Sequence, residues 1–259
     1  MILLPSINID LSMYQKINTY IKLFGIGCPV LKSVLLEEYD SITTQKIEEI
    51  RSYLKSAYCT LRYQYVKPSL KPIMGGNKIR LTIEDISCKI AEDALLWLIE
   101  PIDRLKNQYG INILFNRNTS TLCLECVGKG FDISDLNRGN MNPHQIISFT
   151  LPIEYGWNNE WWKYAKFEFI SKPEFEASKF IRLKKLEMLG FDADESIFSD
   201  IYYPLSLSQV EIIMEYSQKI YTSFTNESEF VVSCSIDENW KYVFWDIQTP
   251  KGKREIYAR

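Results

Sequence analysis

Residues Ile111 to Val127 read INILFNRNTSTLCLECV, and this stretch decides the fold class. Its two ends, 111–116 and 122–127, are mostly apolar and contain several of the residue types that favour strands. The five residues between them, 117–121, are all polar. Two apolar runs on either side of a short polar connection predict a β-hairpin, so we expect antiparallel sheet in this fold.

The flanking sequence predicts further strands and helices in an irregular order. A second hairpin is expected from Glu229–Ile236 and Trp240–Gln248, across the turn at 237–239. Further strands are expected at 29–36, 60–66, 79–81 and 145–153. Helices are expected at 12–25, 41–57, 173–190 and 206–224, and in pieces from Thr82 through Leu95–Leu98 to Gly110. This order predicts an α+β fold with hairpins and mixed or antiparallel sheets, rather than a regular βαβ series.

Two helices carry clear end signals. Ser12 is a capping residue for the first helix, and Gly25 is its stop. Ser171 and Pro173 begin the helix that ends at Gly190, and its inward apolar stripe is expected at Phe180, Leu183 and Leu186.

The length and composition suit a two-lobed chain. The chain has 259 residues, of which 46% are hydrophobic, enough for two small lobes around a shared cleft. Glu100 and Pro101 lie at the joint between the two halves of the pattern. We therefore expect an N-terminal lobe at 1–100 and a C-terminal lobe at 101–259.

Charge and hydropathy exclude several classes of protein. The net charge is -3, so bulk charge gives no sign of a nucleic-acid or membrane-surface protein. The sequence shows no signal-peptide pattern and no apolar run long enough to span a bilayer, so we expect a cytoplasmic protein without a membrane partner. The single histidine, His144, excludes a multi-histidine metal centre and is expected to be a surface residue or a satisfied one, rather than a general base.

The cysteines do not predict a metal site. Cys123 and Cys126 form a C-x-x-C pair, but they lie in a predicted strand, where residues three apart face opposite sides. No second cysteine or histidine pair completes a zinc set. We expect reduced, mostly buried cysteines.

Several polar residues stand out on predicted strands and loops. Arg62 and Gln64 share one face of the strand 60–66, and Lys78 follows the glycines of a flexible loop. A cation beside such a loop can bind phosphate oxygens, although an ordinary turn with a solvated lysine has the same residues. Glu125 and Asp246 each lie in an otherwise apolar strand, where an acidic side chain needs a partner or a metal.

The segment 128–139 is rich in glycine and polar groups. Asp132 and Asp135 could bind a cation, and Arg138 could bind an anion. A purely structural loop is equally compatible with these residues, with Asp135 as a helix cap and Arg138 paired with Asp132.

The order of these pieces resembles the ATP-grasp nucleotide domain of the pyruvate phosphate dikinase and phosphoenolpyruvate synthase group. The segment FGIGCP at 24–29 is similar to the opening G-I-P-V-P of that group, and LRYQ at 61–64 is similar to its V-R-S-S strand. The segment IEPI at 99–102 resembles the hinge Q-E-M-V. The hairpin at 111–127 with Gly128–Gly130, and the closing VFWDIQTP at 243–250, match later segments in order.

This resemblance implies an ATP-grasp-like fold of two lobes that binds ATP and Mg²⁺. It implies phosphate contacts from Arg62, with Gln64 beside it, and from Lys78. It also implies that Glu100 borders the adenosine. Metal ligands are then expected among Asp246, Glu125 and Asp132, and Arg138 with Asp135 would serve the acceptor or a phosphate. The implied function is an ATP-dependent phosphotransferase or ligase with a small-molecule or protein acceptor.

One departure keeps a second function open. The penultimate strand, 231–235, has no aspartate or glutamate where the group has an acidic metal ligand, and Thr249 replaces the closing arginine. The alternative is a catalytically degenerate ATP-grasp-like module that binds a protein partner as a scaffold. Tryptophans 157, 161 and 162 are candidate contacts for such a partner.

Overall fold

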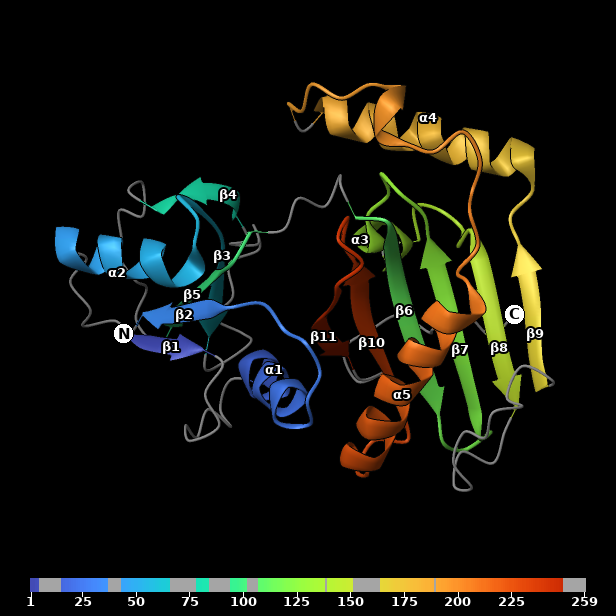
Figure 1. Ribbon diagram of the computed structural model, residues 1–259, viewed down its shortest axis with the longest axis horizontal. Coiled ribbons are helices and arrows are strands. Elements are labelled where there is room, and N and C mark those ends of the chain that lie inside the picture. Colours follow the sequence, from blue (N-terminus) through green and yellow to red (C-terminus); the bar gives the residue numbers. More distant parts are fainter. Residues whose placement is uncertain are drawn as a thin grey trace. The chain divides into compact units, whose positions relative to one another are not determined.

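The structure is a computed structural model that describes residues 1–4, 15–36, 43–65, 78–83, 94–101, 107–137, 139–150, 164–188 and 190–248. The chain divides into two compact units, Met1–Ile102 and Asp103–Arg259, here called unit 1 and unit 2. Figure 1 shows the helices and strands of each unit. The predicted helical pieces at 82–93 and 102–106, apart from Thr82 and Ile83, and the capping residue Ser12 lie outside the described residues.

The described part of unit 1 is built on one antiparallel sheet. Its strands are β1 (Ile2–Leu4), β2 (Ser33–Leu36), β3 (Tyr58–Tyr65), β4 (Lys78–Thr82) and β5 (Ala94–Ile99). They lie in the order β1-β2-β5-β3-β4. Its helices are α1 (Gln15–Gly25) and α2 (Thr44–Leu54), and α2 begins at Thr43, whose side chain accepts a hydrogen bond from the Lys46 amide.

Helices cover both faces of this sheet, and β5 shows the consequence. Leu96 and Leu98 of β5 pack in one core cluster with Ile50 of α2. Trp97 packs in the other cluster with Tyr20 of α1. Because both faces of β5 are buried, its sequence is a continuous apolar run rather than an alternating one. The prediction of helix at Leu95–Leu98 was therefore wrong, since such a run does not distinguish a buried strand from a helix.

Unit 2 is built on a larger antiparallel sheet, and the two predicted hairpins are confirmed as β6–β7 and β10–β11. Its strands are β6 (Tyr109–Asn116), β7 (Thr121–Val127), β8 (Gln145–Thr150), β9 (Ala165–Phe169), β10 (Glu229–Ile236) and β11 (Tyr242–Gln248). They lie in the order β11-β10-β6-β7-β8-β9. All strand pairs of both described sheets are antiparallel, so the predicted α+β class with hairpins is confirmed, and of the two expected sheet types it is the antiparallel one that is present.

Helix α5 (Leu207–Ser223) covers one face of the unit 2 sheet (Figure 1). Tyr221 of α5 stacks on Phe115 of β6 with ring centroids 6.3 Å apart, and Tyr216 meets Phe244 of β11 at 5.0 Å. Side chains alternate along a strand, so residues in step with Phe115 along β6 face α5 and their immediate neighbours face the opposite side. On β11 the register against β10 shifts by one residue between Ser233 and Cys234, so the alternation does not run unbroken from Phe244 to Asp246.

The shorter helix α3 (Ile133–Asn137), helix α4 (Lys172–Met188) and the 3₁₀ turn η5 (Glu195–Ile197) complete unit 2. The buried residues of helix α4 are Phe175, Ser178, Arg182 and Leu186. Phe180 is 61% exposed, so its place in the predicted inward stripe was wrong. In the part of the chain that the structure describes, no helix combines the length and hydropathy needed to cross a bilayer.

Candidate functional site

A row of polar residues crosses the face of the unit 2 sheet that lies opposite α5. Glu125 of β7 pairs in register with Asn112 of β6, which pairs with Ser233 of β10, and Ser233 pairs with Asp246 of β11. Directly paired residues of antiparallel strands project to the same face. We call the four register positions Glu125, Asn112, Ser233 and Asp246 the polar row; Asp246 belongs to it by backbone pairing alone, next to the register shift of β10 and β11.

Hydrogen bonds connect the middle of the polar row. The Ser233 hydroxyl donates to Asn112 Oδ1 at 2.9 Å, and Asn112 Nδ2 donates to Asn137 Oδ1, at the end of α3, at 2.7 Å. Asn112 and Ser233 are buried, with 3% and 5% of their surface exposed. A buried amide held at both ends has a fixed orientation, so α3 and β10 together position the centre of the row.

Glu125 supplies the carboxylate at one end of the row. Burial raises the pKa of this carboxyl above its usual value, and a hydrogen bond with the Asn112 side chain lowers it in part. Burial disfavours the charged form, and a cation bound to the carboxylate would reverse the effect. Glu125 is therefore suited to bind a cation that prefers oxygen ligands.

The two acidic residues of the row are too far apart to bind one ion by themselves. Glu125 and Asp246 are separated by two intervening strands, which is three strand spacings, or about 14 Å between their Cα atoms. Among the described residues, no group of three or more histidine, cysteine or acidic side chains is placed to hold a metal. Mg²⁺ commonly uses only one or two carboxylates, with water and substrate phosphates as its other ligands, so the donors of the row still fit it.

The two aspartates of the glycine-rich loop have partners at α3 and α4. Asp132 Oδ1 accepts from the Ser134 amide at 2.9 Å, at the start of α3. Asp135 accepts from Arg182 Nη1 at 2.9 Å and also pairs with Lys185, both on α4. The structural alternative expected Asp135 to cap a helix here. In the structure it is Asp132 that accepts a hydrogen bond at the start of α3. Arg138 lies outside the described residues.

In unit 1 the predicted phosphate-binding residues lie on neighbouring strands. Arg62 is on β3, where its guanidinium lies 5.8 Å from the ring centre of Trp97 on β5. Lys78 is the first residue of β4 and pairs in register with Leu61, directly before Arg62. Gln64 also lies on β3. The side chains of Lys78, Gln64 and Asp246 lie outside what the structure describes.

Glu100 follows β5 and is tied to the backbone at the end of β2. Its Oε2 accepts from the Lys32 amide at 3.2 Å, and its own amide donates to the Lys32 carbonyl at 2.8 Å. Burial, together with the negative charge of Glu100, raises the pKa of Tyr53. At least one carboxylate oxygen of Glu100 is therefore used inside unit 1.

His144 is buried and does not contribute to the polar row. Its Nδ1 accepts a hydrogen bond from the Gly128 amide at 3.1 Å, and burial lowers the pKa of the imidazole to about 3. Aromatic rings surround it, with Phe131 at 4.4 Å and Phe175 at 4.9 Å between ring centres. The imidazole is therefore neutral near pH 7 and acts as a buried acceptor.

The cysteine pair has the predicted geometry. Cys123 pairs with Leu114, and Cys126 pairs with Ile111, which has the same alternation as Phe115 and so faces α5. The two thiols project to opposite faces of the sheet. Burial, with nearby carboxylates, raises the pKa of Cys123 to about 12.

The sequence identified the acidic ends of the row but missed its centre. The sequence could have indicated Asn112 and Ser233 as site residues, because each is a polar residue with large apolar residues close by in a strand. Asn137 gave no signal, since only α3 brings it to Asn112. Glu168 of β9 was also missed, because strand β9 was not predicted. It lies on the same face, two strands from Glu125, through the pair Ile146–Glu168.

Comparison with known proteins gives structural matches only. No protein-family model and no curated protein sequence matches the chain. Matched structures include the ATP-grasp ligase PsnB complexed with a minimal precursor (7% identity, TM-score 0.41), D-alanyl-alanine synthetase A from Vibrio cholerae (8%, 0.46) and carboxyaminoimidazole ribonucleotide synthase from Aspergillus clavatus complexed with ATP (11%, 0.44). These matches cover 92%, 92% and 91% of this chain, and 52%, 55% and 44% of the respective solved chains. The chain thus spans about half the length of the structures it matches.

Proposed function

We propose that this chain binds Mg-ATP and belongs to an ATP-dependent ligase or phosphotransferase of ATP-grasp type. The observation that carries the proposal is the polar row, which sets a half-buried carboxylate beside an oriented amide and a serine on the face opposite α5. The ordered sequence resemblance and the confirmed antiparallel hairpins support the same proposal.

In this proposal Glu125 is a ligand for Mg²⁺, and Asp246 or Asp132 is a candidate for a second ion or for a water-mediated contact. The ion, when bound with ATP, neutralises charge on the transferring phosphoryl group. Glu125 contributes the negative charge, and Asn112 keeps the carboxylate in place through its hydrogen bond. The remaining ligands of the ion would be phosphate oxygens and water.

Arg62, with Lys78 on the next strand, is proposed to bind the phosphates. A guanidinium can make paired hydrogen bonds to phosphate oxygens, whereas a lysine acts as a point charge. Gln64 is proposed to contact the nucleotide from the same strand, and Glu100 to lie near its ribose.

Arg138 is proposed to bind the acceptor or a phosphate. Asp135 would then act as a positioning residue for the loop before Arg138, because its carboxylate pairs with Arg182 and Lys185. The acceptor is a small molecule or a protein whose reactive group takes the phosphoryl group of ATP.

One observation in the structure favours the non-catalytic alternative. Ser233 lies on the penultimate strand, where the resemblance expects an acidic metal ligand, and it donates to Asn112 instead. A module that kept the fold and lost catalysis would retain such a neutral contact and act through a protein partner.

Thermal unfolding with ATP, in the presence and absence of Mg²⁺, distinguishes the two functions. A ligand at one hundred times its dissociation constant stabilises the folded protein by about 2.7 kcal/mol. We expect a rise in Tm that needs both ATP and Mg²⁺. Unchanged melting with Mg-ATP, together with stabilisation by a protein partner, would support the scaffold function and reject the enzyme.

Two variants assign the effect to residues. Glu125→Gln should remove the dependence on Mg²⁺, and Arg62→Ala should abolish the stabilisation by ATP. The matched control is Glu229→Gln, because Glu229 also lies in this sheet and accepts from a β6 asparagine, Asn116, at 2.7 Å, but outside the polar row. If the control loses the Mg²⁺ effect as fully as Glu125→Gln does, the polar row is not the binding site.

A further inference from the structure

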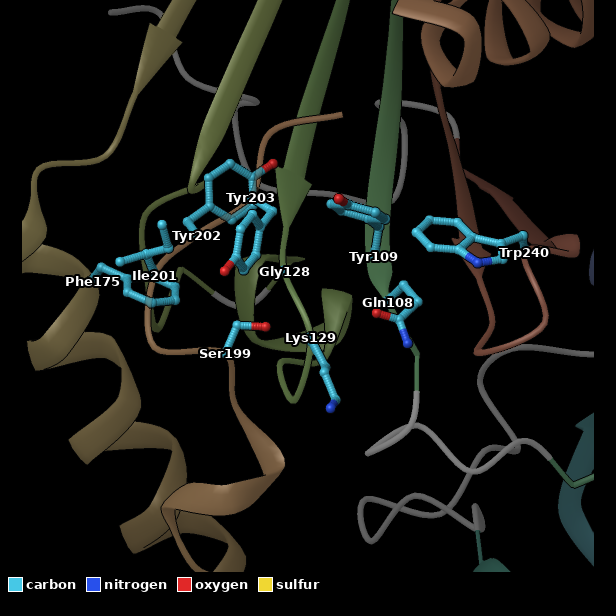
Figure 2. Close-up of a pocket in the computed structure, with 10 residues that line it drawn as sticks. All are labelled: Gln108, Tyr109, Gly128, Lys129, Phe175, Ser199, Ile201, Tyr202, Tyr203 and Trp240. Atoms are coloured by element: carbon cyan, nitrogen blue, oxygen red, sulfur yellow. The ribbon is translucent and has the colours of Figure 1, made fainter. Parts of the chain in front are cut away.

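A hollow lies in unit 2, at the start of β6 and the end of β7 (Figure 2). Tyr109 of β6 has the alternation of Phe115, so it faces the α5 side and not the side of the polar row. The hollow has a volume of about 120 Å³. It is lined by Gln108, Tyr109, Gly128, Lys129, Phe175, Ser199, Ile201, Tyr202, Tyr203 and Trp240. We call it the aromatic pocket.

Aromatic rings form one part of this pocket. Tyr109 and Trp240 lie with ring centres 6.4 Å apart and planes tilted by 43°. Tyr203 and Trp240 are 59% and 56% exposed, which is high for such large rings. Tyr109 is buried, and burial raises the pKa of its phenol, so the hydroxyl stays neutral. The rings offer flat apolar surfaces to a ligand that enters from solvent.

The backbone fixes Trp240 in an uncommon conformation. Its φ is +61°, in the left-handed region that bulky residues rarely adopt. Asp237 holds the turn, because its Oδ1 accepts from the amides of Asn239 at 2.8 Å and Lys241 at 2.9 Å, and its carbonyl accepts from the Trp240 amide at 3.1 Å. Strained residues that their surroundings fix in this way concentrate at binding sites.

Polar groups form the other part of the pocket. Figure 2 shows Ser199, Lys129 and Gln108 spread below the rings, with the Lys129 nitrogen at the outer end of its side chain. Within the described ranges, the Lys129 ammonium has no ion pair or hydrogen bond, and none of the ten lining residues is acidic. A cation at the edge of an aromatic pocket, with no counter-ion among the residues that the structure describes, favours an anionic ligand with an apolar body.

The volume limits the size of the apolar body. An apolar cavity of about 150 Å³ holds a benzene molecule, so this pocket of about 120 Å³, which is open to solvent, has room for at most a single six-membered ring. We propose that the aromatic pocket binds one aromatic ring that carries a carboxylate, with the ring among Tyr109, Tyr203 and Trp240 and the carboxylate at Lys129. The ligand is either a free aromatic acid or the carboxyl-terminal aromatic residue of a peptide, which share this chemistry.

Phenylacetate tests the proposal without ATP or Mg²⁺, so the result is independent of the proposed nucleotide site. Binding is measured by nuclear magnetic resonance titration of the full chain, with phenylacetamide as the neutral ring and acetate as the anion without a ring. We expect phenylacetate to bind about tenfold more tightly than phenylacetamide, and acetate to give no saturable shift. Equal binding of phenylacetate and phenylacetamide, or no saturable binding of phenylacetate, overturns the proposal.

Four variants connect the binding to the pocket. Lys129→Gln should reduce phenylacetate binding to the level of phenylacetamide, and Tyr203→Ala should weaken both. The matched controls are Lys241→Gln and Tyr164→Ala, because Lys241 and Tyr164 are exposed residues of unit 2 that do not line the pocket. Tyr203 and Lys129 contribute little to the core, so these variants should fold. If Lys129→Gln keeps the preference for the acid, the carboxylate does not bind at Lys129.

The two sources of the ligand are separated with short peptides. A tripeptide that ends in phenylalanine with a free carboxylate is compared with the same peptide amidated at its carboxyl end. Tighter binding of the free-acid peptide than of phenylacetate identifies a peptide terminus as the ligand. Weaker binding identifies a small aromatic acid. In either case the amidated peptide should lose most of the affinity.

Discussion

His144 is fully buried, and its imidazole accepts the Gly128 amide hydrogen bond while aromatic rings surround it. A buried imidazole in such surroundings carries a large cost for protonation, and burial lowers its pKa from the ordinary 6.5 to about 3. The only histidine of the chain is therefore a structural residue that makes folding sensitive to acid.

We predict that the free energy of unfolding decreases as the pH falls from about 6.5 to about 3. In this range the unfolded chain binds a proton at His144 and the folded chain does not, so stability is complete above pH 6.5 and falls by about 1.4 kcal/mol per pH unit. Urea unfolding at a series of pH values measures the slope. The raised pKa of Glu125 acts in the opposite direction, since protonation of a buried carboxyl favours the folded state.

His144→Asn is the variant that isolates this effect, because asparagine can still accept from the Gly128 amide. Its slope between pH 6 and pH 4 should be clearly smaller than that of the wild-type protein. A variant with an unchanged slope would mean that other groups dominate the acid response.

Asp135 is the second buried polar group with a clear energetic consequence. Its carboxylate is 4% exposed and pairs with Arg182, which is 6% exposed. We predict that Asp135→Asn lowers the free energy of unfolding by about 3–5 kcal/mol, because the variant removes the negative charge that pairs with the buried guanidinium of Arg182. Chemical denaturation measures the loss. Glu48→Gln, which breaks the exposed pair with Arg51, should cost less than about 0.5 kcal/mol.

At the scale of elements, the start of α5 is a helix end defined by side-chain capping. The Ser206 hydroxyl accepts from the Gln209 amide at 3.3 Å, and the Gln209 side chain accepts from the Ser206 amide at 2.7 Å. This reciprocal capping box satisfies two amides that would otherwise lack partners within the helix. The sequence predicted a helix start at Ser206 or Ser208, and the structure places it at Ser206.

We predict that Ser206→Ala lowers the free energy of unfolding by about 1 kcal/mol and increases hydrogen exchange in the first turn of α5. The reason is that the alanine removes the acceptor for the Gln209 amide. Thr222→Ala is the control, because Thr222 lies near the end of the same helix and is exposed. Equal exchange at the first turn in wild type and Ser206→Ala would contradict a stabilising cap.

The sequence predicted elements well where local signals decide them. Helix ends at Ser206 and Gly25, and hairpins at 111–127 and 229–248, follow from capping and turn residues. The sequence failed where the tertiary environment decides, as for β5, whose two buried faces remove the alternation of a strand. It also failed for α4, because only packing shows that Phe175 rather than Phe180 points inward.

The site was less predictable than the elements, and strand register is the reason. Glu125 and Asp246 were recognisable as acidic residues in apolar strands. Their relation through Asn112 and Ser233 depends on which residues pair across three strand pairs, and a shift of one residue would move each to the other face. The aromatic pocket was not predicted, since Tyr109, Lys129, Tyr203 and Trp240 are far apart in the sequence.

At the scale of the whole molecule, each unit has a buried core of its own. Unit 1 has clusters on both faces of its sheet, and unit 2 has a cluster around Phe131 and Phe175 as well as the layer under α5. A compact unit with its own core can unfold cooperatively by itself.

We predict that a core truncation in one unit destabilises that unit selectively. Leu98→Ala in β5 and Ile113→Ala in β6 each remove fully buried methyl groups, and each should cost about 2–5 kcal/mol. Hydrogen exchange measured by mass spectrometry should show lost protection within Met1–Ile102 for the first variant and within Asp103–Arg259 for the second. Exposed Tyr58→Ala and Tyr164→Ala, one in each unit, are the controls and should change protection only locally. Equal loss of protection across both units in either core variant would show that the chain unfolds as one cooperative body, because two independent cores cannot transmit the defect.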